Sequence, residues 1–172
     1  MLDDLRQEYG PFPIRVETIE NDPDRFERGR EAFERGVRGG AGVRATDDAG
    51  RVLCVREARE PDRWVLPAGG HEPDESVRET ARRETREEAG VSVTLTGIWA
   101  AKRRRFVRRD DPTRRGYLLA VFFTAEPVGE TPEPDPTDTD DDEEILEAAW
   151  VDPTSTDREV LPLVADRTAS VP

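Results

Sequence analysis

The apolar residues of this chain lie in short runs, and the segments between them are charged or rich in glycine and proline. Runs of four to eight apolar residues bounded by turn residues are typical of β-strands. A hydrophobic share of 34% is enough for a core only because it is concentrated in this way. The sequence therefore predicts a sheet built from strands near residues 14–19, 41–45, 52–55, 117–124 and 145–151.

Two further segments have the charged, thinly apolar pattern of surface helices. The first spans residues 23–37 and should end at the glycine pair 39–40, and the second spans residues 74–89 and should end at Gly90. A shorter helix is expected over residues 156–165. Strands interspersed with helices predict an α/β fold, in which a mixed β-sheet is sandwiched between helices as an α/β/α sandwich.

Neighbouring strands are expected to pair in two hairpins. Residues 41–57 have the pattern of a strand, a turn at 47–50 and a second strand. Residues 91–107, interrupted at Gly97, and the apolar run 117–124 are separated by turn residues and predict the other hairpin.

The length of 172 residues fits one ordinary globular domain. We expect this domain to span residues 41–172, with residues 1–40 as an N-terminal extension packed on it. Residues 126–144 are acidic and contain four prolines, so they cannot bury enough apolar surface to order themselves. They predict a mobile loop within the domain.

The net charge of −13 sets limits on partners and environment. An acidic surface repels phosphate backbones, which argues against nucleic acid as a partner. Nearly all 26 basic residues are arginine, Lys102 being the only lysine. We interpret this composition as adaptation to a salty cytoplasm, where ions screen the repulsion between carboxylates; an ordinary acidic protein is the alternative.

The single cysteine, Cys54, excludes an internal disulfide. Its aliphatic neighbours favour a small buried side chain over a nucleophile. Neither a secretory signal nor an apolar run of about 18 residues is present, so no membrane association is expected. These features predict a soluble, cytoplasmic protein.

A cluster of carboxylates marks the second predicted helix. Glu84, Glu87 and Glu88 are three or four positions apart and therefore share one helical face. Carboxylates that close together repel one another, and this density of hard oxygen ligands suits Mg²⁺ or Mn²⁺. Arg83 is placed to hold neighbouring glutamates in a fixed orientation. The structural alternative is a solvated helix face crossed by ion pairs.

The spacing of these residues resembles the Nudix box, G-x5-E-x7-R-E-U-x-E-E-x-G-U, in which U is a bulky apolar residue. Eight positions match: Gly69, Glu75, Arg83, Glu84, Glu87, Glu88, Gly90 and Val91. Thr85 departs from the pattern at the first U position, where looser helix packing is expected. Eight matches over 23 residues are far more specific than a lone glycine motif.

The resemblance implies a metal-dependent hydrolase. The carbonyl of Gly69 and the carboxylates of Glu84, Glu87 and Glu88 would bind Mg²⁺ or Mn²⁺, and Arg83 would position the glutamates. Glu75 would brace the loop against the helix. The general base lies in the helix cluster or in a late loop, and we favour Glu144 over the neighbouring Glu143. His71, at an unspecified position of the box, is interpreted as a loop residue and not as an acid–base group.

The implied substrate is a small nucleoside diphosphate derivative: a nucleotide, a nucleotide sugar or a compound of the ADP-ribose type. Arg103 and Arg105, on one side of a predicted strand, and Arg56 are candidate contacts to its phosphates. The alternative is that these arginines pair with acidic neighbours or with a second copy of the chain in a homodimer.

Two other functions remain open at this point. A Nudix-like module could bind or sense a nucleotide without cutting it, although the loss of box glutamates that would indicate this is not seen. Alternatively, the acidic segment 126–144 could serve as a partner-binding region of an interaction protein.

The lysine-poor acidic composition predicts a stability that depends on salt. The melting temperature should continue to rise with KCl beyond roughly 1 M, where ordinary screening is already saturated. Thermal unfolding followed by circular dichroism over a KCl series tests this, and a melting temperature that is flat above that concentration would contradict the salt-adaptation hypothesis.

Overall fold

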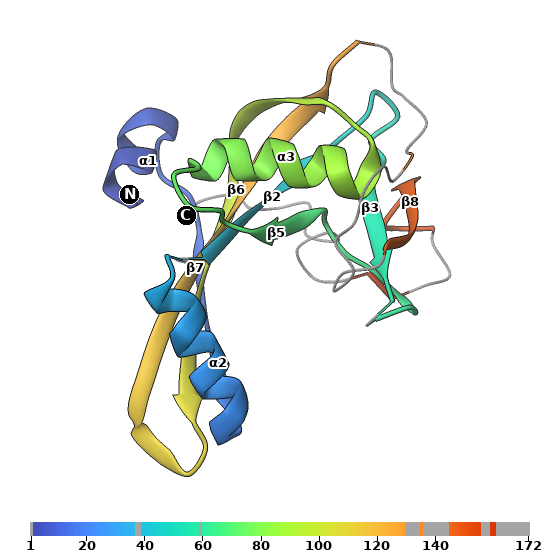
Figure 1. The fold of residues 1–172 in the computed structure, drawn as a ribbon. Helices are drawn as coiled ribbons and strands as arrows, with labels where there is room; N and C mark the ends of the chain where they lie inside the picture. Colours follow the sequence, from blue (N-terminus) through green and yellow to red (C-terminus); the bar gives the residue numbers. More distant parts are fainter. Residues whose placement is uncertain are drawn as a thin grey trace.

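A five-stranded mixed sheet forms the centre of the structure, a computed structural model that describes residues 2–36, 39–58, 60–129, 135, 145–155 and 159–160 (Figure 1). The elements, in chain order, are α1 (Leu2–Tyr9), β1 (Ile14–Asn21), α2 (Pro23–Glu34), β2 (Gly39–Ala45), β3 (Val52–Glu57), β4 (Arg63–Trp64), β5 (Ala68–Gly70), α3 (Val77–Ala89), β6 (Val93–Arg108), β7 (Asp111–Pro127), β8 (Ile145–Val151) and β9 (Glu159–Val160).

The strand order of the central sheet is β1-β6-β7-β2-β5. β1 is parallel to β6 and β2 is parallel to β7, whereas β6–β7 and β2–β5 are antiparallel. Helix α3 lies across β2 and β5, and α2 lies beside the distal part of the β6–β7 hairpin (Figure 1). The predicted α/β class, a mixed sheet flanked by helices, is confirmed.

The main core lies between α3 and the sheet. Ala81 and Ala89 of α3 are fully buried against Val43, Val121 and Phe123 of the sheet. The N-terminal residues take part as well, because β1 extends the sheet and Leu5 of the short helix α1 is 3% exposed within this core. The sequence pattern had not indicated α1.

Helix α2 is shorter than the sequence predicted. It begins at Pro23 after the N-cap Asp22, whose side chain accepts a hydrogen bond from the backbone N–H of Arg25 at 2.9 Å. It ends at Glu34 because Gly36, with φ of +109°, already leaves the helical conformation before the glycine pair at 39–40.

The hairpin predicted over residues 41–57 is wrong. β2 already pairs with β7 on one side and with β5 on the other, so β3 finds no free edge there. After the turn at 47–50, a single bridge joins Thr46 to Val52, and β3 then pairs with β8 in a separate two-stranded sheet. The chain thus passes from one sheet to the other at this turn.

The second predicted hairpin is confirmed and is longer than expected. β6 and β7 pair from Val93 to Arg108, with a register shift between Leu95 and Gly97 at the interruption that the sequence showed.

The helix predicted over residues 156–165 is wrong for the two residues of it that the structure describes, because Glu159–Val160 forms a strand parallel to β4. The rest of that segment lies outside the described residues, as does most of the predicted loop 126–144.

None of the helices in the described part of the chain is long and apolar enough to cross a membrane.

The turn between the two sheets predicts one stability effect. Asp47 is buried, and its carboxylate accepts hydrogen bonds from the backbone N–H groups of Ala49 and Arg51 and from Arg51 Nε, at 2.7–3.0 Å. Asp47→Ala should lower the free energy of unfolding by about 1–3 kcal/mol, because three hydrogen bonds to a charged carboxylate are lost. Urea denaturation would measure the change.

Asp48→Ala is the matched control, since Asp48 is the next residue of the same turn and is exposed. It should change stability by less than about 0.5 kcal/mol. Equal stabilities of the two variants would show that the Asp47 hydrogen bonds do not hold the turn.

Candidate functional site

Helix α3 is fixed at both ends. At its start, Ser76 and Glu79 form a capping box, in which each side chain accepts a hydrogen bond from the other residue's backbone N–H. At its end, Gly90 has a left-handed conformation with φ of +67°, as the sequence predicted. The backbone N–H of Asp135 donates to the carbonyl of Ala89 at 2.9 Å, so Asp135 lies at this end of the helix.

Arg83 joins the helix to the loop that precedes it. Its guanidinium donates to the Glu75 carboxylate at 3.0 and 3.1 Å and to the carbonyl of Gly70 at 2.9 Å. The same guanidinium holds Glu87 through Nη1 at 2.9 Å, and this Nη1 also lies 2.8 Å from a Glu84 oxygen. One positive charge therefore offsets the repulsion among three carboxylates.

The pKa values follow from this arrangement. The hydrogen bond from Arg83 lowers the pKa of Glu75, against a smaller opposing effect of burial. The bond to Glu75, followed by that to Glu87, raises the pKa of Arg83. Both groups are thus held in their charged forms at neutral pH, and the Glu75–Arg83 pair fastens the loop to the helix.

Glu84 lies against the backbone of β5 without a side chain between them. A Cβ placed on Gly69 would be 2.2 Å from the Glu84 Cδ, well inside contact distance. Glycine at this position therefore lets the carboxylate, in a residue that is only 8% exposed, reach the strand.

Glu88 is buried beside the same strand. The residue is 4% exposed, and its Oε2 accepts a hydrogen bond from the backbone N–H of Ala68 at 2.8 Å. Glu87, whose side chain is 35% exposed, lies nearer to solvent. Two of the three cluster carboxylates are thus buried against β5, and the third lies at the rim.

These oxygens fit a hard divalent cation in their chemistry. Carboxylates and a backbone carbonyl are the ligands that Mg²⁺ and Mn²⁺ prefer, and buried like charges are stabilised by a cation. Among the described residues, however, no three acidic, histidine or cysteine side chains converge in the geometry of a metal site. Here Glu84 and Glu87 face Arg83, so a cation would have to compete with the guanidinium for them.

Thr80 belongs to the site, although the sequence pattern did not indicate it. It is fully buried, and its hydroxyl donates to Glu75 at 2.8 Å while lying 3.0 Å from His71 Nδ1. His71 is a loop residue, as predicted, and it contacts the helix through Thr80. The Nudix box specifies no residue at position 80, so only the spacing of five residues from Glu75 could have indicated the contact between the two side chains.

The looser helix packing that was expected at Thr85 is not seen. It is fully buried, and its hydroxyl donates to the carbonyl of Ala81 at 2.7 Å. The polar atom is therefore satisfied within the helix, and the methyl group is free to pack in the core.

The three candidate substrate arginines lie on strands of two different sheets, Arg56 on β3 and the other two on β6. Arg56, on β3, donates to Glu147 at 2.8 Å and to the carbonyl of Pro61 at 2.7 Å. Arg103 is exposed on β6 with its guanidinium 5.8 Å from the Tyr117 ring, and Arg105 is partly buried two residues further along. None of the three forms a hydrogen bond or ion pair with the α3 glutamates among the described residues.

Two other sequence candidates can be placed briefly. Cys54 is fully buried, and burial raises the pKa of its thiol to about 12, which agrees with a structural role. Glu143 and Glu144, the candidate general bases, lie outside the described residues.

The contact between Gly69 and Glu84 predicts a site-specific effect of one methyl group. In Gly69→Ala, the new Cβ should displace the Glu84 carboxylate, which lies at the flexible end of its side chain, so the fold should survive. The affinity for Mn²⁺, measured by calorimetric titration, should fall by about 10-fold or more because a ligand is misplaced.

Gly70→Ala is the control, since a Cβ at Gly70 meets nothing within 4 Å. It should leave both the Mn²⁺ affinity and the melting temperature unchanged. If the Gly69 variant bound Mn²⁺ as tightly as the Gly70 variant, the placement of Glu84 would have no bearing on cation binding.

Two known proteins are similar to part of this chain in sequence. The human protein "Diphosphoinositol polyphosphate phosphohydrolase 3-alpha" is 40% identical over 73 residues, which are 42% of this chain and 42% of the relative. The rat "Diphosphoinositol polyphosphate phosphohydrolase 2" is also 40% identical over 73 residues, covering 42% and 38%. The matched region therefore spans less than half of these relatives.

Solved structures share the fold. A structure titled "Crystal structure of UDP-X diphosphatase" superimposes with a TM-score of 0.52 and 15% sequence identity, covering 81% of this chain and 64% of the other. The family model described as the NUDIX domain matches residues 36–169, most of the chain and the whole of the site described above. The chain belongs to the Nudix family.

Proposed function

We propose that this protein hydrolyses a diphosphate linkage in a small nucleoside diphosphate derivative, with Mg²⁺ or Mn²⁺ as the cofactor. The observation that supports this most directly is the arrangement of α3: Glu84 and Glu88 are buried against β5, beside a glycine that leaves room for a carboxylate. A purely solvated helix face would leave both glutamates exposed.

The cation ligands in this proposal are the Gly69 carbonyl and the carboxylates of Glu84, Glu87 and Glu88. When bound there, a divalent cation neutralises charge on phosphoryl oxygens and lowers the pKa of a water molecule. Among the protein's own groups, Glu88 is already oriented by the Ala68 N–H, and Glu84 by the close approach of Gly69. Glu88 therefore needs little reorganisation to receive a ligand, whereas Glu84 would have to turn away from Arg83 Nη1, which lies 2.8 Å from one of its oxygens.

Arg83 acts as a positioning residue. Its bonds to Glu75 and to the Gly70 carbonyl hold the loop, and hence the β5 backbone, in register with the helix. As Glu84 and Glu87 turned toward a cation, Arg83 would retain the Glu75 and Gly70 contacts. The guanidinium would then balance charge in the site without leaving it.

We further propose that Glu144 is the general base that removes a proton from the attacking water. The support is its place in the sequence, directly before β8, which pairs with β3 beside the main sheet. Glu143 is the neighbouring alternative. Asp135, nine residues before Glu144, donates its N–H to the Ala89 carbonyl at the end of α3.

The names of the relatives support the type of linkage that is cut, and charge supports the phosphate contacts. The matched relatives and the superimposed structure have names that denote phosphohydrolases or a diphosphatase. In this chain Arg56, Arg103 and Arg105 are proposed to contact substrate phosphates, and Arg56 would exchange its Glu147 partner for a phosphate oxygen.

The acidic surface of the protein disfavours nucleic acid as a partner. We propose that the protein works in the cytoplasm and that two copies of it form a homodimer.

The rival function, a module that binds nucleotides without cutting them, would tolerate loss of the cluster carboxylates. All three are retained, and two of them are buried beside β5. This favours the hydrolase.

The direct test is turnover of a panel of nucleotides, nucleotide sugars and dinucleotides with Mg²⁺ or Mn²⁺. Glu88→Gln keeps an oxygen that can accept from Ala68 N–H but loses the charge, so kcat should fall by about 100-fold or more while the fold is retained. Chelation with EDTA should abolish turnover, and added Mg²⁺ should restore it.

Glu79→Gln provides the control, because Glu79 lies on the same helix in the capping box, where glutamine also serves. Its turnover should equal that of the unmodified protein. Hydrolysis that survives in folded Glu88→Gln, or that persists in EDTA, would rule out the proposed metal-assisted mechanism.

A further inference from the structure

The outer edge of β1 is a free edge of the central sheet. β1 pairs with β6 on one side, and no other strand in the described part of the chain pairs with it. The carbonyls of Pro13 and Asn21 accept hydrogen bonds from backbone N–H groups of β6 and of the residue that follows it, so odd-numbered residues point their backbone groups toward β6. Backbone direction alternates along a strand. The N–H and C=O groups that point outward therefore belong to Ile14, Val16, Thr18 and Glu20.

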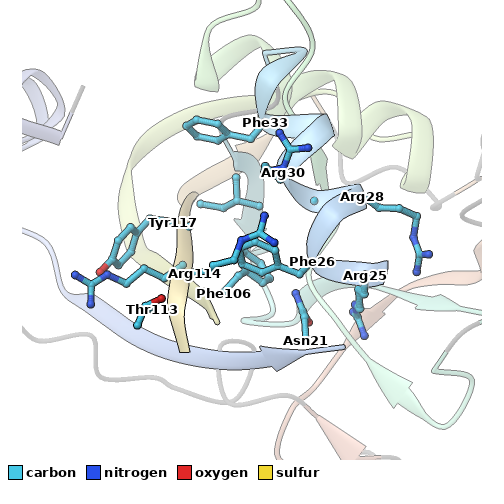
Figure 2. A pocket seen from close by; sticks show the side chains of 14 residues that line it. Asn21, Arg25, Phe26, Arg28, Arg30, Phe33, Phe106, Thr113, Arg114 and Tyr117 are labelled. Carbon is cyan, nitrogen blue, oxygen red and sulfur yellow. The ribbon is translucent and has the colours of Figure 1, made fainter. Parts of the chain in front are cut away.

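The helices before and after β1 turn inward over the sheet and leave this edge uncovered. The Tyr9 ring of α1 lies edge-on to Phe123 of β7, with 6.0 Å between the ring centres. After the strand, Phe26 of α2 and Asn21 at the end of β1 line one pocket between α2 and the β6–β7 hairpin (Figure 2). Both helices thus lie over inner strands, and Val16 on the edge strand is 67% exposed.

β1 lacks the features that usually protect an edge strand from pairing with another chain. Protected edge strands are typically short, bulged, or interrupted by proline or lysine. β1 is eight residues long, pairs with β6 without a register shift, and contains neither proline nor lysine. Val16 also has the largest exposed fraction among the exposed large hydrophobic side chains of the described residues. The edge is therefore suited to the addition of another strand.

The sequence of β1 is complementary to itself. Two copies related by a two-fold axis perpendicular to the sheet would pair their β1 strands in antiparallel orientation. When Val16 lies opposite Val16 of the second copy, outward-pointing backbone groups meet, and Ile14 lies opposite Thr18. Arg15 then lies opposite Glu17 of the second copy, and the symmetry forms this pair twice. Opposite charges in directly opposed positions stabilise a pair of strands.

Other registers of the same two strands are less favourable. A shift of one residue sets outward-pointing backbone groups opposite inward-pointing ones. A shift of two residues places either Glu17 opposite Glu17 or Arg15 opposite Arg15, and like charges that are directly opposed destabilise the pairing. A shift of four residues places Val16 opposite the charged Glu20. The register centred on Val16 is therefore the best match of charged and apolar side chains.

Glu17 is accessible to a cation from a second copy, although two groups of its own chain lie near it. Lys102 Nζ and Arg104 Nε are 3.7 and 3.5 Å from its two carboxylate oxygens, which is longer than an ordinary hydrogen bond. The Glu17 side chain is 43% exposed, and a carboxylate has lone pairs for about four hydrogen bonds. An arginine opposite Glu17 would thus add a contact without displacing the existing ones.

We propose that two copies of the chain associate through their β1 edges, in the antiparallel register centred on Val16. The two five-stranded sheets then form one continuous sheet. β5, beside which Glu84 and Glu88 lie, is the strand at the opposite edge, so both proposed hydrolytic sites remain open. This inference gives an interface to the proposed homodimer and does not depend on hydrolysis. Because the contact is short, the association should be weak and concentration-dependent.

Disulfide cross-linking tests the register. In Val16→Cys, the two cysteines would be directly opposed, with about 5.5 Å between their Cα atoms, a distance that a disulfide spans. In Thr18→Cys, the two cysteines would be four residues out of register and roughly 13 Å or more apart. Mild oxidation at high protein concentration should give a covalent dimer of the first variant and at least about 10-fold less of the second. Cys54 does not interfere, because it is fully buried.

Charge at the same two positions tests the interface without a cross-link. Sedimentation velocity of the unmodified protein in about 0.15 M KCl, which screens the long-range repulsion between two acidic chains, should show a concentration-dependent dimer. Val16→Lys places two ammonium groups opposite each other and should raise the Kd of the dimer by about 10-fold or more. Thr18→Lys is the matched control, because Thr18 is also exposed but lies opposite Ile14. It should change the Kd by less than about 3-fold.

Three outcomes would overturn the proposal. One is an unmodified protein that sediments as a monomer at every concentration. Another is equal dimerisation of Val16→Lys and Thr18→Lys, which would place the contact on a different face, and the third is cross-linking of Thr18→Cys as fast as that of Val16→Cys. A dimer that behaves as expected but hydrolyses no compound of the substrate panel would support this interface and count against the proposed function alone.

Discussion

The Arg83 guanidinium is the interaction on which the site depends. Three glutamates within five residues of one helix would repel one another, and the two that are buried cannot be screened by solvent. Arg83 contacts two of them and also Glu75 and the Gly70 carbonyl. Because these partners lie on α3, on the preceding loop and on β5, a single side chain both balances the charge and fixes the three segments relative to one another.

Much of the fold could be predicted from the sequence, because local patterns determine it. The left-handed Gly90 and the break near Gly97 follow from residue type at single positions. The error at residues 41–57 has a different origin. Strand, turn and strand are all present there, but whether two strands pair depends on which edges of the sheet are already occupied by β5 and β7. That is a property of the whole topology and leaves no local signal.

The site, like the fold, could be predicted from the sequence only in part. Spacing alone places Glu84, Glu87 and Glu88 on one helical face, and the structure adds that Glu84 and Glu88 are buried whereas Glu87 lies at the rim. Burial could not be read from a helix whose apolar stripe is so thin. Thr80 was missed for a related reason, since its hydroxyl reaches Glu75 across the capped first turn and has no fixed place in the motif. The contacts of Arg56 and Arg103 were harder still to predict, because their partners Glu147 and Tyr117 lie on other strands.

Strand β3 has no side that faces solvent. Its side chains alternate between two cores: Leu53 and Val55 point into the cluster beneath α3, and Val52 and Cys54 into the cluster with Trp64 and Phe122. All four are fully buried, so a few apolar residues serve two hydrophobic clusters at once. A charged side chain at any of these four positions would be buried in one cluster or the other, so the excess of acidic residues in this chain has to lie on other elements.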